Sequence, residues 1–338
     1  MSIDISDGID EGNLRIKVLA TNETSVTILT EERFNGKVIQ PGISVPFMPA
    51  EHGLAVSIEV IDGETTHLFL LDTGGSLSTI IENSKKLKID LNKVEKLILS
   101  HGHTDHYGGL TKVISELKEG TEFILNPKCF TNRNQIAVIR SGEELSVEEM
   151  NTKYRQLKKE KKFKFDVKMP VLNKTLITNR ANEHNIKIIE TNQPVKLYKG
   201  ITTSGEIELF DKDEVSKGFF LINENKEFEK NYFRDETSIY INVKNKGLVV
   251  LTGCGHCGIM NTIKHGQKLT GIDKIYAVIG GFHEEWNSDE IIDKKVKYFE
   301  DINPEIICGM HCTGFKFNVK MSKHPAHTLG IVGTEFHL

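Results

Sequence analysis

Three histidines and one aspartate fall within six residues of this chain, and their types point to metal chemistry: His101, His103, Asp105 and His106. Imidazole and carboxylate groups together suit zinc, iron or manganese. The cluster directly follows the apolar run of residues 97–99, and strand ends are where sites collect in layered α/β folds. We therefore interpret this segment as a metal site rather than as a solvated, histidine-rich loop.

The spacing of these four residues suits two ions. His101 and His103 can reach one ion from a short loop, which leaves Asp105 and His106 to point toward a second. Two ions about 3.5–4 Å apart can clamp an attacking and a leaving oxygen, and each lowers the pKa of bound water toward ~7. The predicted cofactors are two divalent metal ions, with zinc as the first choice and iron, manganese or magnesium as alternatives.

Residues of metal-ligand type also follow other apolar runs, each close to a glycine: Asp72, Cys254, His256, His283 and His311. When several strands end in such residues, one site at one edge of a layered fold is the simplest explanation. His256 and His311 are the best candidates for the missing ligands. Asp72 is either a ligand or a carboxylate that orients a histidine.

The elements that must position these residues follow from apolar runs, turn residues and helical periodicity. A pattern of consecutive strands, followed by strands that alternate with helices, occurs twice along the chain. This pattern predicts a mixed α/β fold of the α+β kind. The predicted strands are residues 14–20, 54–61, 67–71, 94–100, 122–125, 195–198, 201–206, 218–222, 237–243, 247–251, 274–279 and 305–308. The predicted helices are residues 78–87, 108–117, 259–268 and 288–300. Residues 25–29 are either a strand or the start of a helix.

The pattern weakens between residues 126 and 194, and we interpret residues 126–194 as an insertion or cap within a single domain of residues 1–338. Inside it, residues 154–164 form a dense basic run. A solvated helical face is the favoured interpretation of this run, and contact with an anionic substrate or a partner is the alternative.

The composition excludes several classes of protein. A hydrophobic content of 38% with 27% charged residues is ordinary for a globular protein, and a net charge of −4 argues against a nucleic-acid partner. No run approaches the ~20 apolar residues of a membrane span, and the acidic N-terminus lacks the order of a signal peptide. Five cysteines, an odd number, do not indicate a disulfide framework. We expect a cytoplasmic protein that acts on a small molecule, without a membrane or nucleic-acid partner.

The pattern His-x-His-x-Asp-His after a strand, with Asp-Thr-Gly upstream, resembles the metallo-β-lactamase superfamily. Matching segments appear in order at residues 50–54, 71–74, 99–110, 203–207, 252–259, 280–283 and 311–314. Together they are similar to the 7,8-dihydropterin-6-yl-methyl-4-(β-D-ribofuranosyl)aminobenzene-5'-phosphate synthase-like branch. The resemblance implies a four-layer αββα sandwich with a dinuclear site between its two sheets, here with an inserted helical and charged segment.

The resemblance carries the metal ligands of the family onto five positions of this chain: His101, His103, Asp105, His106 and His311. It also places Asp72 on the aspartate that supports the site. In this comparison His283 can be a ligand, a substrate contact or an acid–base group, and we favour the last two. Asp105 and His283 are therefore the candidate catalytic residues.

Two positions depart from the family pattern. Residues 203–206 read Thr-Ser-Gly-Glu where hydrolases of the superfamily have Thr-Pro-Gly-His, and Cys254 stands where they have a metal-bridging aspartate. The branch motif implies that His256 replaces a missing ligand, while Cys254 and Glu206 are supporting groups or possible ligands. Cys257 either joins Cys254 in metal binding or oxidation, or packs as a small residue.

Three further residues are predicted to contact the substrate. Glu51 and His52 are expected at the mouth of the site, although a purely structural histidine is the alternative for His52. The helix that begins at Gly258 offers free backbone N–H groups, which can cradle a phosphate.

Three functions fit these residues. The branch activity joins a pterin methyl diphosphate to an aryl ribosyl phosphate, and metal ions stabilise the departing pyrophosphate. The first alternative is a metallo-hydrolase that attacks a phosphodiester, lactone or thioester with metal-bound hydroxide. The second alternative is a non-catalytic metal or redox sensor. We favour a transferase or hydrolase that acts on a phosphorylated small molecule.

Overall fold

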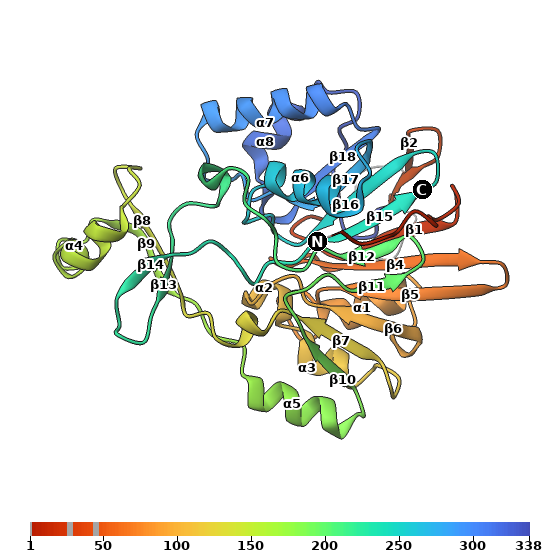
Figure 1. The fold of residues 1–338 in the computed structure, drawn as a ribbon, viewed down its shortest axis with the longest axis horizontal. Coiled ribbons are helices and arrows are strands. Elements are labelled where there is room, and N and C mark those ends of the chain that lie inside the picture. The colour runs from red at the N-terminus through yellow and green to blue at the C-terminus, as the bar shows by residue number, and fades with distance from the viewer. Residues whose placement is uncertain (1, 26–29, 43–46) are drawn as a thin grey trace.

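The structure is a computed structural model, and it describes residues 2–25, 30–42 and 47–338. In this part of the chain two large sheets pack face to face, and helices cover their outer faces (Figure 1). The predicted αββα sandwich is therefore confirmed. The element predicted at residues 25–29 lies, from residue 26 onward, outside the described residues.

Each sheet continues across segments that are far apart in sequence. The first described sheet has the strand order β10 (Lys187–Glu190), β7 (Glu122–Leu125), β6 (Val94–Ile98), β5 (Thr65–Leu71), β4 (Ala55–Asp62), β1 (Leu14–Ala20), β19 (Glu335–His337), β3 (Val38–Gln40) and β2 (Glu31–Arg33). The second has the order β11 (Lys196–Tyr198), β12 (Ile201–Thr203), β15 (Ile239–Val243), β16 (Gly247–Thr252), β17 (Ile275–Gly281) and β18 (Ile306–Met310).

Helices complete the outer layers. Those on the first sheet are α1 (Thr79–Lys86), α3 (Leu110–Ile114) and α5 (Lys174–Glu183), and those on the second are α6 (Ile259–Thr270), α7 (Asp289–Ile302) and α8 (Phe315–Met321). Short helical turns are α2 (Thr104–Tyr107), η1 (Leu91–Lys93), η2 (Pro127–Phe130), η3 (Lys212–Glu214) and η4 (His311–Thr313). None of the described helices is long and apolar enough to cross a membrane.

The core explains why the central strands are apolar throughout rather than alternating. Phe69 and Val249 belong to the cluster between the two sheets. Their neighbours Leu70 and Val250 point the opposite way, into the clusters under the helices. Because successive side chains of a strand face opposite sides of a sheet, a strand covered on both faces needs an apolar residue at every position.

Parallel pairing brings the ligand-type residues together. Strand β5 pairs in parallel with β6, and β17 pairs in parallel with β16 on one side and with β18 on the other. The carboxyl ends of parallel strands meet at one edge of a sheet. The segments after these strands, which begin at Asp72, Leu99, Gly253, Phe282 and His311, therefore lie on the same side of the sandwich.

A third sheet with the order β14 (Phe228–Lys230), β13 (Phe219–Ile222), β8 (Asn134–Ile139) and β9 (Phe163–Lys168) projects to one side of the sandwich (Figure 1). Helix α4 (Val147–Lys159), which starts with a capping box of Ser146 and Glu149, covers its outer face. We call residues 134–168 and 219–230 the cap.

The cap differs from the predicted insertion of residues 126–194. Helix α5 contacts α3, and β10 pairs in parallel with β7, so residues 174–190 extend the main sandwich. Strands β13 and β14, which lie beyond residue 194, join the cap instead. The basic run of residues 154–164 falls on α4 and the start of β9, where most of its side chains face solvent.

Candidate metal centre

Asp72 is the buried carboxylate on which the centre is built. It follows β5 with a positive φ of 61°, a conformation that is uncommon outside glycine. Its carboxylate accepts hydrogen bonds from the Ser100 backbone N–H at 2.7 Å and from the Ser100 hydroxyl at 2.7 Å. It also lies 2.6 Å from Nδ1 of His106. Asp72 therefore holds the His106 ring so that Nε2 faces the centre, as carboxylates do for metal-binding histidines.

One group of possible ligands comprises Asp105, His106, Cys254 and His311, whose ligand atoms lie within 4.8 Å of one another. Nε2 of His106 lies 3.1 Å from Sγ of Cys254 and 3.2 Å from Nε2 of His311. A carboxylate oxygen of Asp105 lies 3.2 Å from the same nitrogen of His311. Two nitrogens, one oxygen and one sulfur thus converge on one point.

A second group comprises His101, Cys254 and His256 within the same 4.8 Å limit. The ring of His103 lies beside it, with its centroid 4.6 Å from that of His101 and 4.9 Å from that of His256. The Nε2 atoms of these three histidines are buried and have no hydrogen-bond partner. Because buried polar atoms are normally paired, a divalent metal ion fits this set of donors.

Cys254 is the residue that the two groups share, and it also belongs to a third group of possible ligands with His283 and Cys312. The sequence favoured His256 over Cys254 as a ligand, and the structure brings both residues to the centre. The sulfur placed beside Cys254 is that of Cys312, 3.3 Å away. Cys257 packs instead in an apolar cluster, with its sulfur 3.4 Å from the Phe233 carbonyl oxygen, which is the simple packing role considered for it.

The two groups differ in their protonation. Burial and neighbouring imidazoles hold the pKa of His101 and of His256 well below its usual value. Burial lowers the pKa of His103 to about 4, although Asp105 opposes the shift. Burial also acts against a charged His106, but the carboxylates of Asp72 and Asp105 outweigh it and raise its pKa to about 9. The second group therefore offers neutral imidazoles, whereas His106 must lose a proton before it can bind a metal.

Several positioning residues carry no recognisable sequence pattern. Asn22, in the loop after β1, lies 3.1 Å from Nδ1 of His311 and 3.2 Å from Nδ1 of His52. Glu236 accepts hydrogen bonds from the backbone N–H groups of His256 at 2.8 Å and Cys257 at 2.6 Å. Their only sequence signal is polarity in segments close to strand ends, which is too common to single them out.

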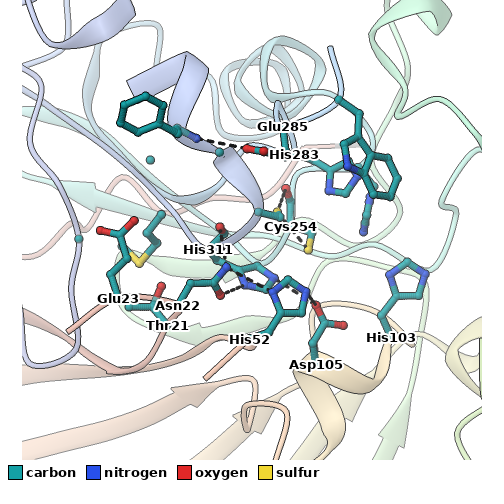
Figure 2. Close-up of a pocket in the computed structure, with 18 of the residues that line it drawn as sticks. Thr21, Asn22, Glu23, His52, His103, Asp105, Cys254, His283, Glu285 and His311 are labelled. Atoms are coloured by element: carbon teal, nitrogen blue, oxygen red, sulfur yellow. Dashed lines mark hydrogen bonds and ion pairs between the residues drawn. The ribbon is translucent and has the colours of Figure 1, made fainter. Parts of the chain in front are cut away.

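The groups open into a cavity of about 560 Å³ (Figure 2). His52, Asp105 and His311 point toward one another there, and the Nε2 atom of His52 lies 3.4 Å from the Asp105 carboxylate. His283 also lines the cavity, with its ring centroid 4.2 Å from that of His256. Both ring nitrogens of His283 are buried and without a hydrogen-bond partner.

Three predicted site residues lie away from this cavity. Glu206 forms ion pairs with Lys128 and Arg234 and lines a separate cavity, so it does not join the ligands. Glu51 accepts a hydrogen bond from the Gly75 backbone N–H at 2.9 Å and so supports a loop. A Cβ atom added to Gly258 would lie 2.5 Å from the Cβ atom of buried Glu214. Glu214 therefore occupies the space beside the N-terminus of this helix that a phosphate would need.

Comparison with known proteins agrees with this geometry. A family model described as the metallo-beta-lactamase superfamily matches residues 53–121. The chain is 31% identical over 279 residues to the 7,8-dihydropterin-6-methyl-4-(beta-D-ribofuranosyl)-aminobenzene-5'-phosphate synthase of Methanocaldococcus jannaschii, a match that covers 81% of this chain and 85% of that protein. It is 28% identical over 285 residues to an uncharacterized protein of the same organism, covering 84% of this chain and 92% of that protein.

The fold has a counterpart among solved structures. A metal-dependent hydrolase of the beta-lactamase superfamily superposes with a TM-score of 0.65 and 23% identity, covering 96% of this chain and 99% of the other. Identity at this level shows a shared fold. The match to the synthase adds sequence similarity across most of both chains. The chain therefore belongs to the metallo-β-lactamase superfamily of metal-dependent enzymes, in the branch that includes this synthase.

Proposed function

We propose that this protein is a transferase of the dihydropterin–(ribofuranosyl)aminobenzene phosphate synthase type. The observation that carries the proposal is the 31% identity to such a synthase over 85% of that protein's length. In the proposed reaction the amine nitrogen of the aryl ribosyl phosphate bonds to the methyl carbon of a pterin methyl diphosphate. The bond from that carbon to the diphosphate oxygen breaks, the amine loses a proton, and pyrophosphate leaves.

The proposed cofactor is a pair of divalent ions, with zinc as the first choice. His101, His103 and His256 would hold one ion, and Asp105, His106 and His311 would hold the other. Cys254 belongs to both groups and occupies the position of the family's bridging aspartate, so we propose it as the shared ligand. When bound, the ions supply positive charge that stabilises the diphosphate as it departs.

We propose that His283 receives the proton lost by the attacking amine. Its side chain lines the cavity, and the free ring nitrogens can accept a proton without breaking a protein hydrogen bond. The Asp105 carboxylate, close to both His52 and His311, would keep these two rings in place around the substrate. Geometry of this kind matters because a proton acceptor must lie within hydrogen-bond reach of its donor.

The test is direct assay of the metal-loaded protein with both substrates, following pyrophosphate release and the mass of the coupled product. We expect stoichiometric product and pyrophosphate, lost in His311→Ala and retained in His184→Ala, a matched change at the end of α5 away from the cavity. Absence of both products in a metal-replete protein would contradict the proposal.

A panel of phosphodiesters and lactones separates the hydrolase alternative. The solved neighbour described as a hydrolase is only 23% identical, so it supports the fold and not this activity. The protein would be identified as a hydrolase if it turned over members of this panel, if His103→Ala abolished that turnover, and if the pterin pair released no pyrophosphate.

A further inference from the structure

The mouth of the cavity is lined by apolar side chains that are exposed to solvent. Among the described residues, four large apolar side chains that are exposed to solvent line this one cavity: Phe165, Trp286, Phe315 and Leu329. Soluble proteins rarely leave such side chains together unless a ligand or partner covers them. The cavity is thus divided into a polar end, where the ligand groups lie, and an apolar mouth.

The cap contributes its side of the mouth through an irregularity in strand pairing. Phe163 and Phe165 are two residues apart, so a regular strand would point both to the same face. Val138 pairs with Phe165 whereas the next residue, Ile139, pairs with Phe163, so Lys164 is an extra residue. Because of this bulge, the side chains of Phe163 and Phe165 point to opposite faces of the sheet. Phe163 packs against Tyr154 of α4, and Phe165 points to the sandwich.

The sandwich contributes Trp286, from the loop between β17 and α7. Its ring centroid lies 6.2 Å from that of Phe165 and 5.7 Å from that of Phe219, with the Phe219 and Trp286 rings only 21° from parallel. We call Phe165, Phe219 and Trp286 the aromatic wall. His283 adjoins it, with its ring centroid 5.4 Å from Phe219 and 5.5 Å from Trp286. A ring bound against this wall would therefore lie beside the proposed proton acceptor.

The charges around the cavity orient the substrate. No lysine or arginine lines the cavity among the residues that the structure describes, and the charged groups outside the ligand cluster are the carboxylates of Glu23 and Glu285. These carboxylates disfavour a phosphate at the mouth. The diphosphate end must therefore point to the metal end, which leaves the uncharged end of the molecule at the mouth.

We propose that the aromatic wall binds the flat pterin ring and selects the substrate by that ring, independently of the metal centre. Large aromatic side chains offer planar apolar surface, and stacked or edge-on ring contacts add to it. The assignment of a pterin, rather than another flat heteroaromatic ring, rests on the proposed function. Phe165 comes from the cap, so the cap completes the ring-binding surface that the sandwich begins with Trp286.

The test uses the fact that Trp286 is the single tryptophan of the chain, so its fluorescence reports on the wall directly. We expect 6-hydroxymethyl-7,8-dihydropterin, which lacks the diphosphate, to quench this emission saturably after correction for its own absorption. Pyrophosphate alone should leave the emission unchanged. Phe165→Ala should weaken pterin binding on the order of ten-fold, the size of one ring-stacking contact.

A matched control separates the wall from general loss of aromatic surface. Phe210 is as exposed as Phe165, at 43% against 42%, but does not line this cavity, so Phe210→Ala should bind pterin like the wild type. Calorimetry replaces fluorescence for Trp286→Ala, which should also bind about ten-fold more weakly, while Trp286→Phe recovers most of the affinity. Thermal melting of each variant shows whether it is folded.

The outcomes distinguish this inference from the proposed function. Equal pterin affinity in the wild type, Phe165→Ala and Trp286→Ala would contradict pterin binding by the aromatic wall, even if pyrophosphate release proceeds. In another outcome, the protein shows saturable quenching that is lost in Phe165→Ala and yet makes no coupled product. That result would support pterin binding by the aromatic wall and contradict the proposed transferase function. Unchanged emission at saturating pterin in the wild type would also overturn the wall.

Discussion

The metal end and the mouth of the cavity are built in opposite ways. At the metal end, buried polar groups are fixed by hydrogen bonds, as in the three contacts that Asp72 makes with Ser100 and His106. At the mouth, apolar rings such as Phe165 and Trp286 meet across two separately formed parts of the fold. The first arrangement fixes the positions of individual donor atoms, whereas the second sets shape and apolar area.

This contrast separates reaction chemistry from substrate selection. A polar network of this kind tolerates little change, because each lost partner leaves a buried donor or acceptor unsatisfied. Apolar contacts can be exchanged for others of similar volume at a smaller cost. Substitutions at the metal end should therefore alter metal content and kcat, and those at the mouth should alter ring affinity and KM.

The largest effect is expected at Cys254, because it belongs to both ligand groups. Cys254→Ala should lower metal affinity by more than 100-fold, beyond the about 10–100-fold expected when a residue outside the ligand set is lost. Elemental analysis after dialysis measures the bound metal. Cys257→Ala, a change in the same loop, should keep its metal, and equal metal loss in both variants would argue against Cys254 as the shared ligand.

Asp72→Asn should have the next largest effect. Asparagine accepts the positive φ and keeps the shape of the side chain, but it removes the negative charge that holds His106. Metal affinity should fall about 10–100-fold, which competition with a chromogenic chelator measures. An Asp72→Asn protein with wild-type affinity would show that the histidine is oriented by its other contacts.

The pH dependence of metal binding tests the difference between the ligand groups. The pKa of His106 is raised to about 9, and burial raises the pKa of the Cys254 thiol well above its usual value. Both groups carry a proton at pH 7, so metal must displace it, and affinity should rise with pH up to at least 9. His101, His103 and His256 are already neutral and add no such dependence.

Calorimetry in buffers of different ionisation enthalpy counts these protons. We expect about two released per loaded chain at pH 7, falling to about one in Cys254→Ser. Metal binding without proton release would contradict the protonation states assigned to His106 and Cys254.

The smallest effect is expected at Glu206. Its carboxylate pairs with Lys128 and Arg234 at a separate cavity, where exposed ion pairs contribute little. Glu206→Gln should leave metal content and kcat within about two-fold of the wild type, in the size range of a surface pair. A large loss of metal would place this residue back among the ligands that the sequence left open.

Sequence and structure agree best where a residue type has few alternative uses. The sequence anticipated that the cluster from His101 to His106 would meet the distant His256 and His311, because imidazoles at strand ends beside glycines rarely serve packing alone. The order of apolar runs predicted a mixed α/β fold for a similar reason, and the resemblance to the family supplied the sandwich. Both signals are local, and neither depends on how separate segments meet.

The features that escaped prediction depend on contacts between distant segments. Asn22 and Glu236 each contact two residues that are distant in sequence, and no residue spacing predicts these contacts. The bulge at Lys164 needs the pairing of β8 with β9, and the division of residues 126–194 needs the parallel pairing of β10 with β7. The helix N-terminus at Gly258 was predicted to bind a phosphate because the sequence does not show that Glu214 packs against it.

Metal stoichiometry is the most direct test of the centre described here. Elemental analysis of metal-loaded protein should find about two ions per chain in the wild type, as a two-ion site requires. Removing one ligand from either group, in His256→Ala or in His311→Ala, should leave about one ion per chain. A wild-type protein that holds a single ion, or none after supplementation, would contradict the two-ion centre.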